Sequence, residues 1–401
     1  MRRAIVLVFD RLSAGFLGPY GNTWVETPQF NRLAAESALF EFAMTDSPDL
    51  HRTYGSYWSG WHACASRLPE KGLGDRLSAS GVPAVLFTDS SEIAQHPLSG
   101  GFREGVLVRP SGSHVTASDV NRTQLAQLML DALRWLERAE GSYLFWLHAR
   151  GLEGPWDAPL ELRNQFADEA DPVPSDLVTP PVGWVADDED PDRLLGIQQA
   201  YAGQICLIDQ CLEGFLSACA AIPGWEETLV LVTSPRGYPL GEHGRIGPVD
   251  ACIFGETLHV PCLVRYPGPE HAMTRNLQMV QPSDVHATLE QWLGVSGGDS
   301  PSWGQNLADL LEQRVVSDRA CAVSSSCHAL RTEDWFLHSQ QGQVALYAKP
   351  DDRWEANEVA VRCQDLIPEL EQIWQDFRQA AAAGDRSRLA PLPEFATAIG
   401  R

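Results

Sequence analysis

Side chains that could carry catalysis or binding lie directly after four apolar runs. Asp10 follows AIVLVF (4–9), Asp89 follows VPAVLF (82–87), His148 ends SYLFWLH (142–148), and the cluster SPRGYPLGEH (234–243) follows TLVLV. In parallel sheets, functional side chains gather where the strands end. We therefore expect these residues to line one cleft.

The elements that must position these residues follow from the alternation of apolar runs with amphipathic stretches. Continuous apolar strands separated by helices are typical of a mainly parallel, doubly wound α/β sheet. We expect this domain to cover residues 1–314, with a further strand at 260–266 and helical stretches at 27–40, 123–139 and 200–219.

Residues 315–401 have a different pattern. Alternating strands joined by Gln-Gly precede an amphipathic stretch near 364–382. This pattern predicts a small antiparallel sheet followed by a helix.

One acidic segment interrupts the first domain. Residues 167–192 contain nine acidic residues, five prolines and no Lys or Arg. This composition predicts an extended, mobile loop. Alternatively, the segment forms a lid over the cleft.

The charge, the N-terminal segment and the cysteines limit which partners the protein can bind and in which cellular compartment we expect it. The chain has 30 Lys and Arg against 53 Asp and Glu, a net charge of −23, which disfavours binding to nucleic acid or anionic membranes. The apolar run after Met1 is too short for a signal peptide or a membrane span, so we expect a cytoplasmic protein. Nine cysteines without a CxxC pair predict buried free thiols.

Several segments, taken in their order along the chain, resemble the sulfatase branch of the alkaline phosphatase superfamily. FDRLSAGFLGPYG with TPQFNRLAAESALFEFA is similar to the family's opening strand, LGxYG turn and helix. Later matches are SYLFWLHARGLEGPWDAP, TLVLVTSPRGYPLGEHG, LHVPCLVRYPG, SDVHATLEQWLGV, WGQNLADLL and ALYAKPDDRWEANEVA. The resemblance covers nearly the whole chain and implies the family's fold.

The resemblance also implies a metal site, and this chain departs from it. Members of the family hold a divalent cation with two consecutive Asp after the first strand, and with Asp and His or Asn after a later one. Here those pairs read Asp10-Arg11 and Pro235-Arg236. Because a hard cation needs several oxygen ligands, we expect Asp10 to be a vestigial ligand and no cofactor to be bound. The alternative is one divalent cation, Ca²⁺ or Mg²⁺.

The family's nucleophile is also missing. Aligning SPDLHRTYGSYWSG (47–60) with the family's SPxCxPSRxxLLTG places Leu50 at the nucleophile and Tyr54 at the Arg. Thr53 and Arg52 lie nearby but are displaced by two or three positions. Thr53 is therefore a substitute nucleophile in one interpretation and a capping or surface hydroxyl in the other.

The remaining contacts that the resemblance implies are partly kept. Asp89 stands where the family has Lys, and Glu153 stands where it has a second His. His148 and His243 are retained, although His243 in GEHG also fits a structural turn.

The two arginines at the former ligand positions, Arg11 and Arg236, could fill the space of the missing cation. Asp10, and Glu242 or Asp89, would then be their partners. In the alternative, both arginines point into solvent.

Together these observations predict a sulfatase-like protein without the family's metal-dependent hydrolysis, which binds a small anion or a protein partner. The alternative is an active sulfuric or phosphoric ester hydrolase, or a transferase, with a rearranged site. Such a site would use Thr53 or Asp49 with His148 and His243.

Overall fold

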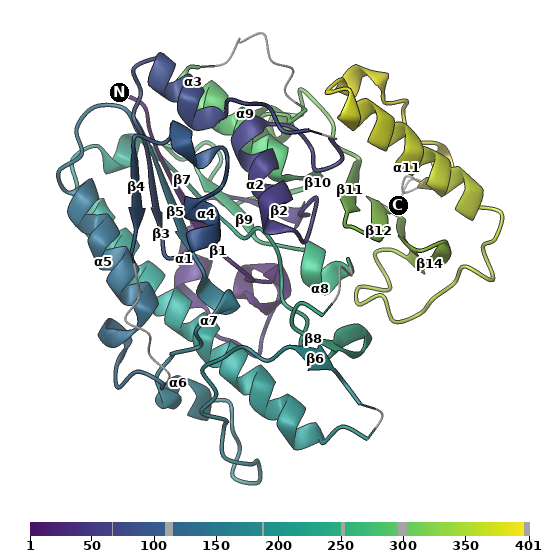
Figure 1. Cartoon of the computed structure of the whole chain (residues 1–401), viewed down its shortest axis with the longest axis horizontal. Coiled ribbons are helices and arrows are strands. Elements are labelled where there is room, and N and C mark those ends of the chain that lie inside the picture. The colour runs from purple at the N-terminus through teal and green to yellow at the C-terminus, as the bar shows by residue number, and fades with distance from the viewer. Residues whose placement is uncertain (66, 109–114, 187, 250–252, 296–302, 397–401) are drawn as a thin grey trace.

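The computed structural model describes residues 1–65, 67–108, 115–186, 188–249, 253–295 and 303–396. Within them, an eight-stranded sheet has the strand order β10-β2-β9-β7-β1-β5-β3-β4 (Figure 1). Neighbouring strands are parallel except at β9, which runs antiparallel to β2 and β7. The mainly parallel sheet predicted from the sequence is confirmed. Its strands are β1 (Arg3–Phe9), β2 (Ala38–Ala43), β3 (Ala84–Thr88), β4 (Glu104–Leu107), β5 (Tyr143–Ala149), β7 (Thr228–Thr233), β9 (Cys262–Arg265) and β10 (Thr274–Val280).

Helices cover both faces of this sheet. Phe9 belongs to a buried cluster with residues of α1, α5 and α7, whereas Val8 belongs to a second cluster with residues of α2, α3 and α9. Because adjacent side chains of a strand point to opposite faces, the two clusters lie on opposite sides of β1. The fold is therefore doubly wound, as expected. Its helices are α1 (Pro28–Ala35), α2 (Leu50–Ser59), α3 (Leu73–Ala79), α4 (Ser91–Ala94), α5 (Gln124–Leu136), α6 (Leu160–Asn164), α7 (Pro191–Ala220), α8 (Gly255–Leu258), α9 (Pro282–Leu293) and α10 (Leu307–Leu311).

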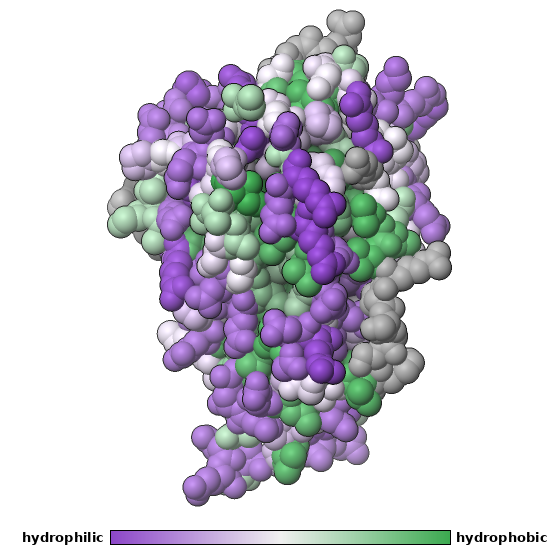
Figure 2. All heavy atoms as spheres, turned by 90° about the vertical axis from the view of Figure 1, so that its left-hand side faces the viewer, coloured by the Kyte–Doolittle hydropathy of each residue, from purple (hydrophilic) through white to green (hydrophobic). Residues whose placement is uncertain are grey.

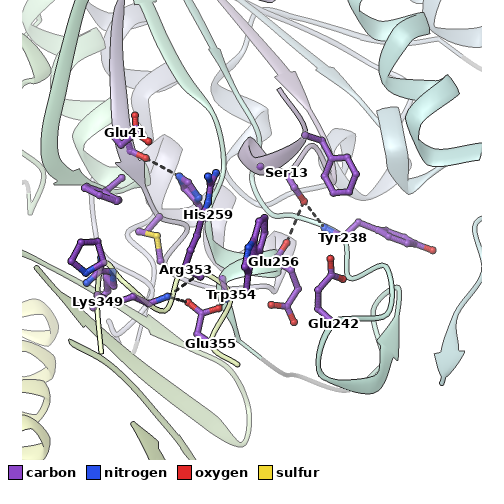
Figure 3. A pocket seen from close by; sticks show the side chains of 17 residues that line it. Ser13, Glu41, Tyr238, Glu242, Glu256, His259, Lys349, Arg353, Trp354 and Glu355 are labelled. Carbon is purple, nitrogen blue, oxygen red and sulfur yellow. Dashed lines mark hydrogen bonds and ion pairs between the residues drawn. The ribbon is translucent and has the colours of Figure 1, made fainter. Parts of the chain in front are cut away.

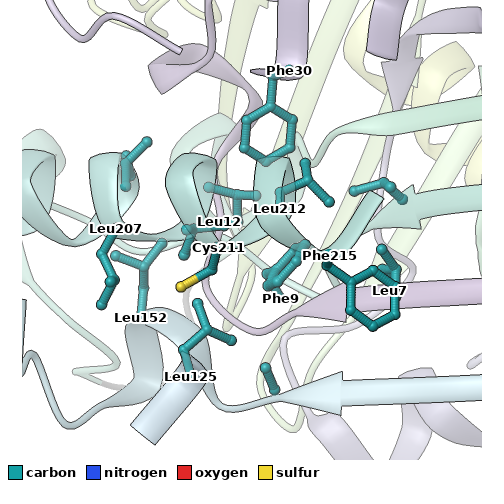
Figure 4. Close-up of a cluster of buried hydrophobic side chains, with 14 of the residues drawn as sticks. Leu7, Phe9, Leu12, Phe30, Leu125, Leu152, Leu207, Cys211, Leu212 and Phe215 are labelled. Carbon is teal, nitrogen blue, oxygen red and sulfur yellow. The ribbon is translucent and has the colours of Figure 1, made fainter. Parts of the chain in front are cut away.

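The first cluster fixes the end of β1, where Asp10 lies. Leu207, Leu212 and Phe215 of α7 belong to the same buried cluster as Phe9 and Leu12 (Figure 4). All five side chains are at most 1 % exposed. Each contributes about 1.5–3 kcal/mol by leaving water, so the backbone beside Asp10 rests on a rigid base.

The C-terminal part contains a separate antiparallel sheet in the order β11-β12-β13-β14, followed by α11 (Ile367–Ala382). One face of this sheet packs on α11, and the other packs on residues of the main part such as Phe254 and Met279. Gln341-Gly342 joins the last two strands, as predicted. The division into domains 1–314 and 315–401 stays a prediction. The strands are β11 (Arg319–Val323), β12 (Cys327–Thr332), β13 (Trp335–Gln340) and β14 (Gln343–Ala348).

Several elements differ from the sequence-based expectation, among them the unpredicted strand β4. The helix predicted over 27–40 ends at Ala35, and Ala38 already begins β2. Strand β10 was not predicted. It lies at the edge of the sheet and its first five residues alternate in exposure, so it lacks the continuous apolar run of a central strand.

The acidic segment 167–192 is irregular over most of its described length, and α7 begins at Pro191. Its strand β6 (Gly183–Trp184) pairs with β8 (Arg245–Ile246), just after His243. Trp156 N donates to Val178 O at 2.7 Å, which ties the segment to the main part. Its predicted mobility and the lid alternative stay predictions.

Hydrophilic side chains cover much of the face that carries β4 and α5 (Figure 2). In the described part of the chain, no helix is both long enough and apolar enough to cross a bilayer. The described cysteines are all free, and Cys64 and Cys363 are the ones not fully buried. This confirms the prediction of free thiols for those residues, whereas Cys252 lies outside the described residues.

Candidate functional site

The ends of β1 and β7 lie side by side because these strands pair in parallel, with Val8 opposite Thr233. Ser234 links the two chain segments beyond the strands. Its Oγ accepts a hydrogen bond from Leu12 N at 3.1 Å and donates one to Arg236 O at 2.7 Å. This link brings Arg236 next to Asp10.

Arg236 binds Asp10 through both nitrogens of one edge of its guanidinium. Nε lies 3.0 Å from Asp10 Oδ1, and Nη2 lies 2.9 Å from Oδ2. The third nitrogen, Nη1, donates to Pro48 O at 3.1 Å. Asp10 is 1 % exposed and Arg236 is 8 % exposed. Arg236 therefore lies in the cleft beside Asp10 rather than in solvent, which is the first of the two sequence-based alternatives for this arginine.

Arg11 forms the second ion pair of the site. Its Nε lies 2.6 Å from Glu153 Oε2, and the same oxygen is 3.6 Å from Arg236 Nη2. Arg11 has a positive φ of 67°, which is rare for a residue with a Cβ. Tyr201 OH donates to the Arg11 carbonyl at 2.7 Å and holds this conformation. The backbone thus turns Arg11 back over the cleft.

The glycine of the PRG sequence has a packing reason. A Cβ added to Gly237 would lie 2.0 Å from the Glu256 carbonyl oxygen. Any larger residue would push the chain away, so Gly237 allows the close approach that positions Arg236.

The four charges tune one another. Burial would raise the pKa of Asp10, but the charge and hydrogen bonds of Arg236, with help from Arg11, hold it below its ordinary value. Burial would lower the pKa of Arg236, but Asp10 and Glu153 raise it above its ordinary value. Burial and the charge of Arg236 lower the pKa of Arg11. Asp10 is therefore ionised at neutral pH and Arg236 is fully charged.

Two partners suggested by the sequence pair elsewhere. Arg11 forms its ion pair with Glu153, so the expectation that Glu242 or Asp89 would be its partner was wrong. Asp89 Oδ1 accepts from Arg150 N at 2.8 Å, and Glu242 Oε2 accepts from Leu240 N at 2.5 Å. Both carboxylates are occupied by backbone N–H groups, because each lies at a turn with exposed donors.

His148, at the end of β5, is fully buried. Its Nδ1 lies 2.6 Å from Tyr54 OH, which also accepts from Trp146 Nε1 at 3.4 Å. His148 Nε2 has no hydrogen-bond partner among the described residues. Burial lowers the pKa of His148 to about 4, so the ring is neutral at pH 7.

Thr53 is not poised as a nucleophile. Its hydroxyl donates to Ser47 O at 2.7 Å and lies 3.1 Å from Asp49 O. The residue is completely buried in α2, whose first residue, Leu50, lines the cleft. Thr53 is therefore neither a surface hydroxyl nor a free attacking group. Its hydroxyl instead hydrogen-bonds backbone carbonyl groups just before the helix.

The cleft at this site has a volume of about 340 Å³. Five of its lining residues were named from the sequence, namely Arg11, Asp49, Leu50, Arg52 and Arg236. Sequence reasoning missed other polar residues of its wall, which are Glu92, Arg245, Thr257, Ser324 and Ser325. Arg245 directly follows GEHG and could have been noticed. No sequence pattern links Ser324 and Ser325, between β11 and β12, to a cleft of the first domain.

A second cavity, of about 240 Å³, lies between the main sheet and the C-terminal segment (Figure 3). Glu242 lines it, and His243 Nδ1 lies 3.0 Å from Glu256, another lining residue. His243 Nε2 lies 3.1 Å from the Glu355 carbonyl oxygen. Both nitrogens are thus engaged away from Asp10, and the structure does not bring His243 together with His148 and Thr53.

The donor set beside Asp10 does not fit a divalent cation. Both Asp10 oxygens are bound by Arg236, and the position of the neighbouring ligand is held by Arg11. In the part of the chain that the structure describes, no three His, Cys, Asp or Glu side chains group so as to hold a metal ion. A cation here would face two guanidinium charges, and the two carboxylates beside them, Asp10 and Glu153, are already paired with those arginines.

Comparisons with known proteins agree with this geometry at the level of the fold. The family model described as Sulfatase matches residues 78–295. The multifunctional alkaline phosphatase superfamily protein PehA of Trinickia caryophylli is 27% identical over 132 residues, which cover 32% of this chain and 25% of that protein. The matched part thus spans a quarter of that relative's length.

Two solved structures are similar over the whole chain. The phosphonate monoester hydrolase of Agrobacterium radiobacter has a TM-score of 0.79 at 18% identity, with 100% of both chains covered. A 2-O GAG sulfatase has a TM-score of 0.74 at 16% identity, with 100% of this chain and 98% of that chain covered. At these identities, the likeness establishes the fold.

Proposed function

This chain belongs to the sulfatase family, and we propose that it keeps the family's cleft as a binding site for a small anion without the family's metal-dependent hydrolysis. The observation that carries the proposal is the bidentate pair between Arg236 and Asp10. The Arg236 guanidinium binds both carboxylate oxygens of Asp10, which would otherwise be free to bind a cation. The positive charge at the end of β1 therefore comes from the protein itself.

In the described part of the chain, the position at which the family resemblance expects the nucleophile carries no attacking group, which supports the loss of hydrolysis. Leu50 lies where the family resemblance expects the attacking residue, and a leucine side chain cannot attack phosphorus or sulfur. The nearby Thr53 hydroxyl is buried and bound to backbone carbonyls. Reaching a substrate would require breaking both contacts and moving the first turn of α2.

The lining of the cleft supports anion binding. It contains four arginines, which are Arg11, Arg52, Arg236 and Arg245, and the hydroxyl residues Thr257, Ser324 and Ser325. Guanidinium groups bind sulfate, phosphate and carboxylate oxygens through paired N–H donors, and hydroxyl groups supply further hydrogen bonds. A single sulfate- or phosphate-type group is the ligand that this lining suits best.

Two measurements on the purified full chain test the proposal. Calorimetric titration with inorganic sulfate and phosphate should give saturable binding that Arg236→Met weakens. Aryl sulfate, phosphate and phosphonate esters should show no hydrolysis above buffer, with or without added Ca²⁺ or Mg²⁺. Hydrolysis that scales with protein concentration and disappears in Asp10→Ala would overturn the proposal in favour of a hydrolase with a rearranged site.

A further inference from the structure

The carboxylate of Glu153 lies between the guanidinium groups of Arg11 and Arg236, two residues that line the cleft. Its Oε2 is 2.6 Å from Arg11 Nε and 3.6 Å from Arg236 Nη2. This arrangement of one anionic oxygen between two cations is the one that a bound oxyanion would adopt.

The two acidic partners of the arginines differ in accessibility. The side chain of Asp10 is 1% exposed, whereas that of Glu153 is 37% exposed. Asp10 is enclosed and already uses both oxygens on Arg236. Glu153 can turn toward solvent, where its charge is hydrated at little cost.

Removing Glu153 from this position would leave one unbalanced charge. Asp10 neutralises Arg236, while Arg11 is 4% exposed and has the Glu153 carboxylate as its closest acidic partner. A buried guanidinium without a counterion is costly, so the departure of Glu153 needs an incoming anion. Both arginines line the cleft from which such an anion would arrive.

We propose that Glu153 is an internal stand-in for the ligand, and that a sulfate- or phosphate-type anion binds Arg11 and Arg236 by displacing its carboxylate. This inference rests on the anion-binding function proposed above and adds the position and the competing group. Because displacement removes one negative charge, the ligand must bring at least one. The Glu153 carboxylate thus competes with the anion for Arg11 and Arg236, so the wild-type protein binds the anion weakly. Neutral compounds do not bind.

The variant Glu153→Gln tests the inference because it removes the competing charge and keeps the size of the side chain. Inorganic phosphate and sulfate are titrated into wild type and variant by calorimetry at one fixed ionic strength. We expect roughly tenfold tighter binding to Glu153→Gln, the range set by one charge-assisted contact.

Glu92→Gln is the matched control. Glu92 lines the cleft and carries the same charge, but it acts on Arg236 only through its charge, because no ion pair joins it to Arg11 or Arg236 among the described contacts. Glu92→Gln should therefore strengthen anion binding less than Glu153→Gln. A general loss of negative charge would strengthen binding equally in both variants. The double variant Arg11→Met with Glu153→Gln locates the anion, because it should lose the gain.

The outcomes separate the inference from the function on which it rests. A clearly larger gain in binding for Glu153→Gln than for Glu92→Gln supports both. Wild-type binding that is unchanged in Glu153→Gln, or equally improved in Glu92→Gln, overturns the role of Glu153 and leaves the anion site. No binding by any variant overturns the proposed function and, with it, the inference.

Discussion

Arg236 and Asp10 meet edge to edge at the adjoining ends of β7 and β1, through two hydrogen bonds of 3.0 and 2.9 Å. The pair is nearly inaccessible to solvent, so each charge depends on the other. A buried pair of this kind is stable only when both members are present. This dependence makes the pair measurable.

We expect Asp10→Ala to lower the free energy of unfolding by about 3–5 kcal/mol, because Arg236 would keep a buried charge without its counterion. Asp10→Ala with Arg236→Met should recover part of this loss, since the stranded charge is removed with its partner. Urea unfolding of wild type, both single variants and the double variant measures the coupling.

The exposed pair Arg32 and Glu213 provides the control for this cycle, because its side chains are 65% and 50% exposed. Its coupling should be about 0–1 kcal/mol. Strictly additive effects at Asp10 and Arg236 would contradict the interpretation of Arg236 as a replacement for the cation.

Added Ca²⁺ or Mg²⁺ should not raise the melting temperature of the wild-type protein. A ligand that binds the native state stabilises it, but Asp10 has no oxygen left free of Arg236. Differential scanning fluorimetry across a cation series checks this.

A variant that restores oxygen ligands is the positive control for the metal prediction. Arg11→Asp with Pro235→Asp and Arg236→Asn rebuilds the ligand types implied by the family resemblance. It should gain a cation-dependent increase in melting temperature. Equal stabilisation of the wild type would contradict a site closed by arginine.

Asp46 should make the protein more stable at mildly acidic pH. Burial raises its pKa from 3.8 to about 7, although Ser56 Oγ and Ala63 N donate to Oδ2. Between pH about 4 and about 7 the native state keeps a proton that the unfolded chain has lost, so stability falls as pH rises.

Asp46→Asn should remove this contribution and be more stable than the wild type at pH about 8, on the order of 2 kcal/mol. Urea unfolding at several pH values checks the difference between the two proteins. The variant must be compared with the wild type because burial also lowers the pKa of His62 to about 3, which makes stability rise with pH. This contribution is the same in both proteins and cancels in the comparison. A variant with the same pH dependence as the wild type would count against Asp46.

Thr53→Val should cost about 1 kcal/mol of stability, because the hydroxyl that satisfies Ser47 O and Asp49 O is lost. Thr53→Ser, which keeps the hydroxyl, should stay closer to the wild type. Anion binding should be unchanged in both variants. Ester hydrolysis that Thr53→Val abolishes and Thr53→Ser retains would assign Thr53 a catalytic role instead.

Much of the fold could be predicted because local pattern and burial agree in its central strands. The runs that became β1, β5 and β7 are apolar throughout, since both faces of these strands are covered by helices. At the edge this agreement fails. The exposed residues of β10 hid the strand, and the start of β2 continued the amphipathic pattern of the preceding helix.

The sequence by itself determined which residue types stand where the family resemblance implies the other metal ligands, namely Arg11, Pro235 and Arg236, none of which can supply carboxylate oxygens. It also determined that the ends of the first strand and of the strand before Ser234 would meet, because parallel strands of one sheet end at the same edge. Only the tertiary structure decided how the charges pair. Glu153, rather than Glu242 or Asp89, is the partner of Arg11 because the turn after β5 places it against that arginine. The carboxylates of Glu242 and Asp89 accept hydrogen bonds from backbone N–H groups instead. In the same way, the loop with Ser324 and Ser325 reaches the cleft because its sheet packs on the main part through Phe254 and Met279, a contact between segments that no local pattern encodes.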